Sequence, residues 1–128
     1  MLSRIRLPRR RPRSRTIEAT VKGVRIFLTV GEHADGSVGE VFIDVGKTGS
    51  AFRELMCCFS ILVSLCLQHG VPLSLLVKRF AGVNFEPSGT VTGQPGIDTA
   101  SSIVDCIFRM LANEYPEQAG EGKREAAE

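Results

Sequence analysis

The sequence predicts an α+β fold: a three-stranded antiparallel meander followed by about three helices, the first of them central and buried. Three observations support this fold class. Residues 17–45 contain short β-branched and aromatic runs separated by turn signals, residues 50–69 form one long apolar run, and two later stretches repeat apolar residues at helical spacing. The apolar face of the meander needs a cover, and the helix that comes next in the chain would provide it.

Three strands are expected, at Ile17–Val21, Val24–Val30 and Glu40–Val45. The second is rich in β-branched and aromatic side chains. Asp35-Gly36 lies in the turn-rich segment before the third strand and is a strong hairpin signal.

The first helix is expected from Ser50 to His69, and Gly70 ends it. Between residues 55 and 67 only Ser60 and Ser64 interrupt the apolar run, and a helix that is apolar almost all round is normally buried almost all round. About 13 apolar positions are too few for a bilayer, which needs ~20. The sequence therefore predicts a core helix.

Two further helices follow. Val71-Pro72 begins the second, which ends at Gly82, and the last runs from about residue 98 or 101 to Asn113. Residues 82–97 between them are dense in glycine and proline. A loop this long in a small domain is usually functional or mobile.

Charge divides the chain into three parts. Seven of its 16 basic residues and no acid fall within residues 1–15, so the remainder has nine bases against 14 acids. We expect a basic flexible arm over 1–15, a single domain over 16–114 and a disordered acidic tail over 115–128.

The arm has two interpretations. It is either a solvated tail that tethers the chain to a partner, or a contact to nucleic-acid phosphates, because clustered arginines favour such binding. The candidate residues for nucleic-acid or partner binding are Arg9, Arg10, Arg11, Arg13 and Arg15.

A second candidate is the loop before the first helix, made of Gly46, Lys47, Thr48, Gly49 and Ser50. Thr48 or Ser50 could cap the helix. A Walker A motif would need glycine where Val41 stands, so that motif is absent. Free N–H groups at a helix start beside Lys47 could hold an anion or phosphate, and a simple structural turn is the alternative.

No metal site, cofactor or catalytic residue is expected. The four cysteines (Cys57, Cys58, Cys66 and Cys106) lie in apolar helices without a Cys-x-x-Cys pair, and they are expected to be buried and reduced. His33 and His69 lack a neighbouring nucleophile in a plausible relay, so surface or capping roles are expected for them.

The order of these pieces resembles the TSCPD domain. The similarity covers roughly residues 10–113 and rests on two blocks, Glu-Val-Phe-Ile through Gly-Lys-Thr-Gly-Ser at 40–50 and Ser-Leu-Cys-Leu-Gln-His-Gly-Val at 64–71. The resemblance implies a relation to adenosylcobalamin-dependent (class II) ribonucleotide reductases, which carry this domain near their C-terminus, and to short free-standing proteins.

The chain departs from the family at its name motif, Thr-Ser-Cys-Pro-Asp, which falls at residues 101–105. Only Ser102 and Asp105 remain of it. A further cysteine that is frequent in the family would fall near residues 84–87, which read Asn-Phe-Glu-Pro. If the family's cysteines bind metal or do redox work, this chain has lost those groups.

The resemblance implies a non-catalytic accessory or regulatory module related to ribonucleotide reductase. It would act in deoxyribonucleotide synthesis through protein contact, for example with the reductase large subunit, or through nucleotide-phosphate contact. The catalytic barrel has no counterpart here, so no turnover by this chain alone is expected. The alternatives are a nucleic-acid-binding regulator that uses the arm, and a phage-type inhibitor or adaptor. Edge strands favour a homodimer, and the lack of a signal peptide or membrane span favours the cytoplasm.

Overall fold

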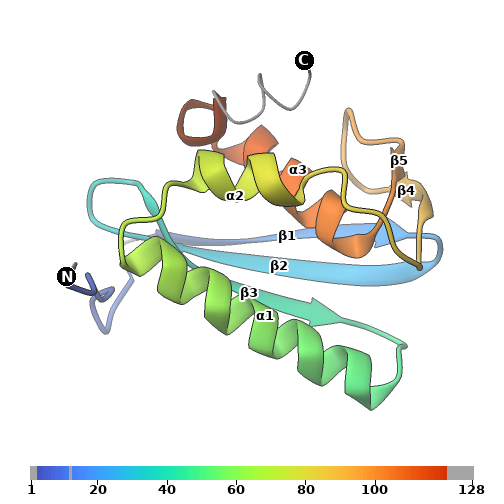
Figure 1. The fold of residues 1–128 in the computed structure, drawn as a ribbon, viewed down its shortest axis with the longest axis horizontal. Coiled ribbons are helices and arrows are strands. Elements are labelled where there is room, and N and C mark those ends of the chain that lie inside the picture. Colours follow the sequence, from blue (N-terminus) through green and yellow to red (C-terminus); the bar gives the residue numbers. More distant parts are fainter. Residues whose placement is uncertain (1–2, 12, 121–128) are drawn as a thin grey trace. The chain divides into compact units, whose positions relative to one another are not determined.

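The computed structural model describes residues 3–11 and 13–120. Hydrogen bonds join the strands in the order β3-β2-β1-β4-β5 (Figure 1). The α+β class and the order of an antiparallel meander followed by helices are confirmed. The elements are β1 Arg13–Val21, β2 Val24–Glu32, β3 Val38–Val45, α1 Ser50–Gln68, α2 Leu73–Phe80, β4 Gly89–Thr92, β5 Thr99–Ala100 and α3 Ile103–Glu114.

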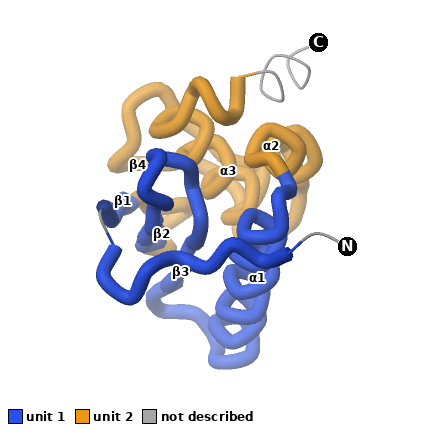
Figure 2. The backbone as a smooth tube through the Cα atoms, turned by 90° about the vertical axis from the view of Figure 1, so that its left-hand side faces the viewer, with its two compact units in different colours: residues 1–18, 26–71 blue, residues 19–25, 72–128 orange. Residues whose placement is uncertain are grey.

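The chain divides into two compact units, so the stretch predicted as one domain is described here in two parts (Figure 2). Unit 1 comprises residues 1–18 and 26–71. Unit 2 comprises residues 19–25 and 72–128.

The turn between β1 and β2 lies in unit 2 and has two residues, Lys22 and Gly23. Both have positive φ, 47° and 81°, as a type I′ hairpin requires. The β2–β3 turn of unit 1 confirms the Asp35-Gly36 signal, since Gly36 has φ 89° and its N–H donates to the His33 carbonyl.

In unit 1, β2 and β3 form an antiparallel ladder that runs from Ile26 opposite Val45 to Glu32 opposite Val38. Helix α1 packs against β3, which is an edge strand of the sheet (Figure 1). Met56, Val63 and Leu67 are the apolar side chains that α1 buries.

A polar stripe on α1 faces the open edge of β3. The Ser64 hydroxyl accepts from the Val41 N–H at 2.9 Å and lies 3.1 Å from the Val41 carbonyl oxygen, and Gln68 Nε2 donates to the Gly39 carbonyl at 2.9 Å. A strand edge carries unpaired N–H and C=O groups that need partners. Side chains of α1 supply those partners at two positions of the edge.

The prediction that α1 is buried almost all round is wrong. Leu55, Ile61 and Leu62 are 65%, 55% and 59% exposed, while Ser60 and Gln68 are buried. The sequence shows Ser60 and Ser64 only as interruptions of the apolar run. In the structure Ser64 and Gln68 hydrogen-bond the β3 edge, and Leu55, Ile61 and Leu62 face outward.

By length and composition α1 could cross a membrane, although a core helix of a soluble protein can pass the same test. The expectation that it falls short of membrane-spanning length is therefore not upheld. Only 22% of its most apolar window is buried. The hydrogen bonds of Ser64 and Gln68 nevertheless attach the helix to β3 along one side.

In unit 2, α2 packs against α3, and Phe80 stacks on Phe108 with ring centroids 5.4 Å apart. Part of the predicted 82–97 loop is a strand: β4 pairs with β1 through Val91 opposite Val21 and with β5 through Thr90 opposite Thr99. Val91 is buried, which explains why a glycine-rich segment is held in a sheet. Beyond α3, residues 116–120 are helical, and the rest of the predicted tail lies outside the described residues.

Candidate functional site

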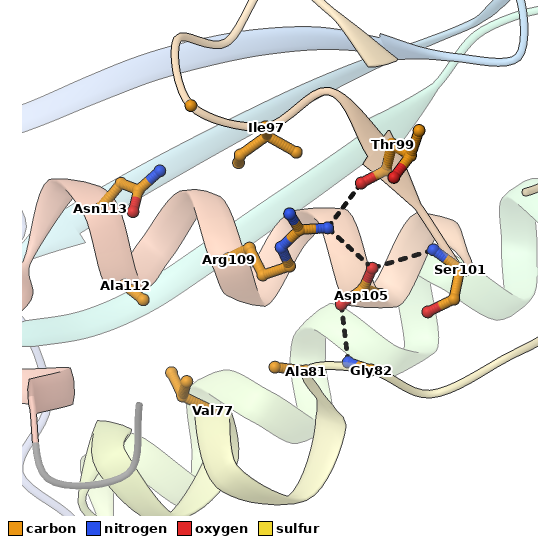
Figure 3. Close-up of a pocket in the computed structure, with 11 residues that line it drawn as sticks. Val77, Ala81, Gly82, Ile97, Thr99, Ser101, Asp105, Arg109, Ala112 and Asn113 are labelled. Carbon is orange, nitrogen blue, oxygen red and sulfur yellow. Dashed lines mark hydrogen bonds and ion pairs between the residues drawn. The ribbon is translucent and has the colours of Figure 1, made fainter. Parts of the chain in front are cut away.

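A pocket of about 550 Å³ opens in unit 2 between the end of α2, the segment around Ile97 and the start of α3 (Figure 3). Apolar contacts come from Val77, Ile97 and Ala112. The two charged residues among its lining, Asp105 and Arg109, lie one helical turn apart on α3.

Asp105 is 3% exposed and its carboxylate is fully engaged. Oδ1 accepts from the Gly82 N–H at 2.6 Å, and Oδ2 accepts from the Ser101 N–H at 2.9 Å and from Arg109 at 3.2 Å (Figure 3). Both oxygens of this carboxylate therefore have N–H donors as partners. Asp105 connects the segment after α2 to the start of α3.

Ser102 caps α3. Its hydroxyl accepts from the Asp105 N–H at 2.9 Å and donates to the Val83 carbonyl at 2.7 Å. This is the N-cap arrangement of a serine followed three residues later by an acid. The structure thus brings together Ser102 and Asp105, the two residues predicted as remnants of a family motif, and Ile103 and Val104 between them are buried.

Arg109 closes the group by donating to the Thr99 carbonyl at 2.6 Å as well as to Asp105. Next to Asp105, burial raises the pKa of the Cys106 thiol to about 11, and the neighbouring carboxylate adds to the rise. Cys106 is therefore a protonated core thiol at neutral pH. Cys106 does not line the pocket, whose lining combines apolar side chains with polar ones such as Thr99, Ser101 and Asn113.

The predicted anion loop lies in unit 1. Gly49, not Thr48 or Ser50, is the N-cap residue of α1, and no side chain caps the helix, so the predicted cap is wrong. Lys47 is exposed and has φ 55°, which turns the chain into the helix. Among the described residues, the Thr48 hydroxyl is a buried polar atom without a hydrogen-bond partner.

The arginines of the predicted arm are largely bound to unit 1, and β1 begins inside that arm. Arg11 donates two hydrogen bonds to the Glu40 carboxylate, Nε to Oε2 at 2.5 Å and Nη2 to Oε1 at 2.8 Å. These bonds raise the pKa of Arg11. Arg13 and Arg15 lie 4.0 and 3.8 Å from the carboxylate of Glu32.

These contacts change the expected role of the arm. Glu32 and Glu40 are buried, so their charges need nearby cations. Arg9 and Arg10 are exposed. Three of the five candidate arginines thus already face carboxylates of the same unit, which weakens the case for a phosphate-binding arm.

The prediction that all four cysteines are buried is confirmed for Cys106 of α3 and is wrong for the cysteines of α1. Cys106 is buried, Cys66 is half-buried, and Cys57 and Cys58 are exposed. His69 makes a capping contact, with Nδ1 2.8 Å from the Leu65 carbonyl oxygen. Among the described residues no group of three or more His, Cys, Asp or Glu side chains could hold a metal ion.

Sequence reasoning missed Arg109 and the buried pair Glu32 and Glu40. The Asp105–Arg109 spacing of four residues on a predicted helix was a usable signal for a paired contact. Glu32 and Glu40 lie next to the hairpin turn, and the sequence did not distinguish them from solvent-exposed acids.

Comparisons with known proteins agree on one family. The TSCPD domain model matches residues 3–115. The chain is 48% identical over 112 residues to a vitamin B12-dependent ribonucleotide reductase of Agrobacterium fabrum and 45% identical over 115 residues to one of Bradyrhizobium diazoefficiens, covering 88% and 90% of this chain. It is 44% identical over 112 residues, 88% of this chain, to one of Streptantibioticus cattleyicolor.

The chain spans 9% of the length of the first two relatives and 18% of the third. No solved structure matched it. The family match extends from residue 3 to residue 115 and so includes the Ser102–Asp105 cap at the start of α3. The chain therefore belongs to the TSCPD domain family.

Proposed function

We propose that this chain is a non-catalytic accessory or regulatory module related to ribonucleotide reductase, acting in the cytoplasm in deoxyribonucleotide synthesis. The observation that carries the proposal is the relation to the reductases: the matched relatives are named as vitamin B12-dependent ribonucleotide reductases, and they align with this chain over a small part of their length. A module of that kind acts by contact, and its partner would be the large chain of a reductase.

The geometry of unit 2 supports a contact role. The charged groups that line its pocket bind each other and the backbone, so they hold α3, the Gly82 segment and the Thr99 segment together. A general acid or base needs a proton that it can exchange with a substrate. Both carboxylate oxygens of Asp105 instead accept hydrogen bonds from N–H donors of its own unit.

A binding experiment tests the partner. The affinity-tagged chain is incubated with the purified B12-dependent reductase of the same organism, and both the co-purified reductase and its turnover are measured. The proposal predicts stoichiometric retention and a changed turnover rate. Absence of retention together with unchanged turnover would count against it.

We further propose that the module contacts nucleotide phosphates, and that the loop Gly46–Ser50 is the binding site. Lys47 is exposed beside the uncapped start of α1, where backbone N–H groups attract anions, and the Thr48 hydroxyl has no partner among the described residues. We expect ATP to shift the amide resonances of residues 46–50 in an NMR titration.

The matched variants are Lys47→Ala and Lys22→Ala. Both lysines sit at positive φ, so each substitution removes one charge at the same kind of backbone position. Lys47→Ala is expected to weaken ATP binding about 10-fold, and Lys22→Ala is expected to leave it unchanged. Equal effects of the two variants would show non-specific attraction and would remove the loop from the proposal.

A further inference from the structure

Arg109 lines the pocket of unit 2 and uses only part of its hydrogen-bonding capacity. Its Nη1 donates to the Thr99 carbonyl at 2.6 Å and to the Asp105 carboxylate at 3.2 Å, so both hydrogens on that nitrogen have an acceptor. The N–H groups of Nε and Nη2 have no partner in the part of the chain that the structure describes. A guanidinium keeps its charge in proteins, so these are donors of a permanent cation.

The free side of this guanidinium is accessible from the pocket. The Arg109 side chain is 37% exposed, and the pocket that it lines has a volume of about 550 Å³. In Figure 3 the two guanidinium nitrogens without a dashed line lie on the side away from Asp105. A ligand in the pocket therefore meets two neighbouring N–H donors, Nε and Nη2, in one plane.

The guanidinium is also held in place before any ligand arrives. The Thr99 carbonyl and the Asp105 carboxylate fix Nη1, and Asp105 is itself held by the N–H groups of Gly82 and Ser101. Because the side chain is already ordered, binding costs little further conformational entropy. The buried Asp105 thus acts as a positioning residue for Arg109.

The free polar groups determine the charge of the ligand. Both oxygens of Asp105 already accept N–H bonds, whereas Nε and Nη2 of Arg109 can only donate. The ligand must therefore supply acceptor oxygens, and the two coplanar oxygens of a carboxylate match such a pair of donors. Asp105 already offsets part of the Arg109 charge, so a singly charged carboxylate fits better than a doubly charged phosphate.

The remaining lining favours an aliphatic group on that carboxylate. Val77, Ile97 and Ala112 line the pocket with apolar side chains, and all of them belong to unit 2. Sites for small ligands commonly measure roughly 300–1,000 Å³ and combine apolar walls with a few polar groups. The volume and the lining of this pocket both fit that description.

We propose that the pocket of unit 2 binds a monocarboxylate with a short aliphatic body, and that Nε and Nη2 of Arg109 hold the carboxylate. A free aliphatic acid and the C-terminal residue of a peptide share this chemistry. The inference does not depend on the reductase relation, and the reductase-binding experiment does not test it, so the two proposals fail separately.

An NMR titration of the full chain tests the ligand class. The probes are 4-methylpentanoate for a free acid and N-acetyl-leucine for a peptide C-terminus, with the two corresponding amides as uncharged controls. We expect an acid to shift the Arg109 Nε–H resonance and the Gly82 amide with a dissociation constant of roughly 1–10 mM. The amides are expected to bind at least ~10-fold more weakly. Tighter binding of N-acetyl-leucine identifies a peptide C-terminus, and otherwise a free acid is identified.

Three variants locate the binding. Arg109→Gln removes the paired donors and is expected to weaken acid binding at least ~10-fold. Arg79→Gln is the matched control, because it removes the same charge from an exposed position of α2 and is expected to leave binding unchanged. Ala81→Leu adds bulk at a half-buried lining position without touching Arg109, and it is expected to weaken binding to a similar extent. Circular dichroism checks that each variant is folded, and Ala81→Leu decides the matter if Arg109→Gln is not.

Four outcomes would overturn the proposal. The first is the absence of a saturable shift with either acid up to roughly 50 mM. The second is equal binding of acid and amide, and the third is inorganic phosphate that displaces the acids at a lower concentration than theirs. The last is unchanged acid binding by folded Arg109→Gln or Ala81→Leu, since the acid would then bind outside this pocket.

Discussion

Asp105 shows how much one carboxylate contributes to unit 2. It accepts N–H bonds from Gly82 and Ser101 on different oxygens, and its own N–H is capped by Ser102. Ser102 and Asp105, which are predicted from the sequence to be remnants of the family motif, thus form a helix cap. Ile103 and Val104 between them are buried in the core.

Replacing Asp105 by asparagine tests this role. The amide has one oxygen and one NH₂ group, so one of the two backbone N–H groups would face another donor. We expect the free energy of unfolding to fall by about 2–3 kcal/mol. Urea unfolding measures it, with Asp98→Asn, an exposed aspartate of the neighbouring segment, as the control. An equally stable Asp105→Asn variant would contradict the assignment.

Cys106 gives the unit a defined pH dependence. Its folded pKa of about 11 lies above the usual value of 9.0, so the folded state keeps the thiol proton that the unfolded state loses in this range. The contribution is complete below pH 9 and is lost as the pH rises to about 11. Relative to Cys106→Ala, the wild-type chain should lose about 2–3 kcal/mol of stability between these limits. A constant difference in urea midpoints would contradict it.

At the scale of the element, α1 is the helix that the sequence describes least well. Its bounds, Ser50–Gln68, are close to those predicted, because the apolar run and Gly70 mark them. Its orientation about its own axis could not be predicted. Ser64 and Gln68 form hydrogen bonds with the backbone of the β3 edge, and polar side chains can equally well form such bonds with water. Periodicity identifies the two sides of a helix but does not tell which one faces the sheet.

The same limit applies to the other elements. The meander and its Asp35-Gly36 turn are local signals, and they were predictable. Strand β4 was not, because its pairing with β1 joins residues about 70 positions apart. At the candidate site, Ser102 and Asp105 came from the motif, whereas Arg109 and the Gly82 N–H join them only in three dimensions.

Ser64→Ala tests the attachment of α1 to the β3 edge. The variant leaves the Val41 N–H without its partner, and we expect a loss of about 1–2 kcal/mol in the free energy of unfolding. Ser74→Ala on α2 is a matched serine in a helix of unit 2, partly exposed and expected to be neutral. If the two variants unfold alike, the strand-edge contact does not stabilise the fold.

At the scale of the whole molecule, the basic N-terminal segment pairs with two buried acids of unit 1, Glu32 and Glu40. Arg11 forms a two-bond pair with the buried Glu40, whereas Arg10 is exposed. Arg11→Ala should lower the melting temperature and Arg10→Ala should not, although both remove one charge. A solvated arm would instead give two unchanged melting temperatures, which differential scanning calorimetry can distinguish.

The central claim is that α1 is attached to β3 along its polar side and presents an apolar face outward. The most direct measurement is the rate at which a thiol reagent labels the cysteines of the folded chain, followed by mass spectrometry. Cys57 and Cys58 of α1 are exposed, whereas Cys106 of α3 is buried. The account predicts that Cys57 and Cys58 react readily and that Cys106 does not. If Cys57 and Cys58 stay as unreactive as Cys106 in the folded chain, the account is contradicted, because α1 would then be buried in the core.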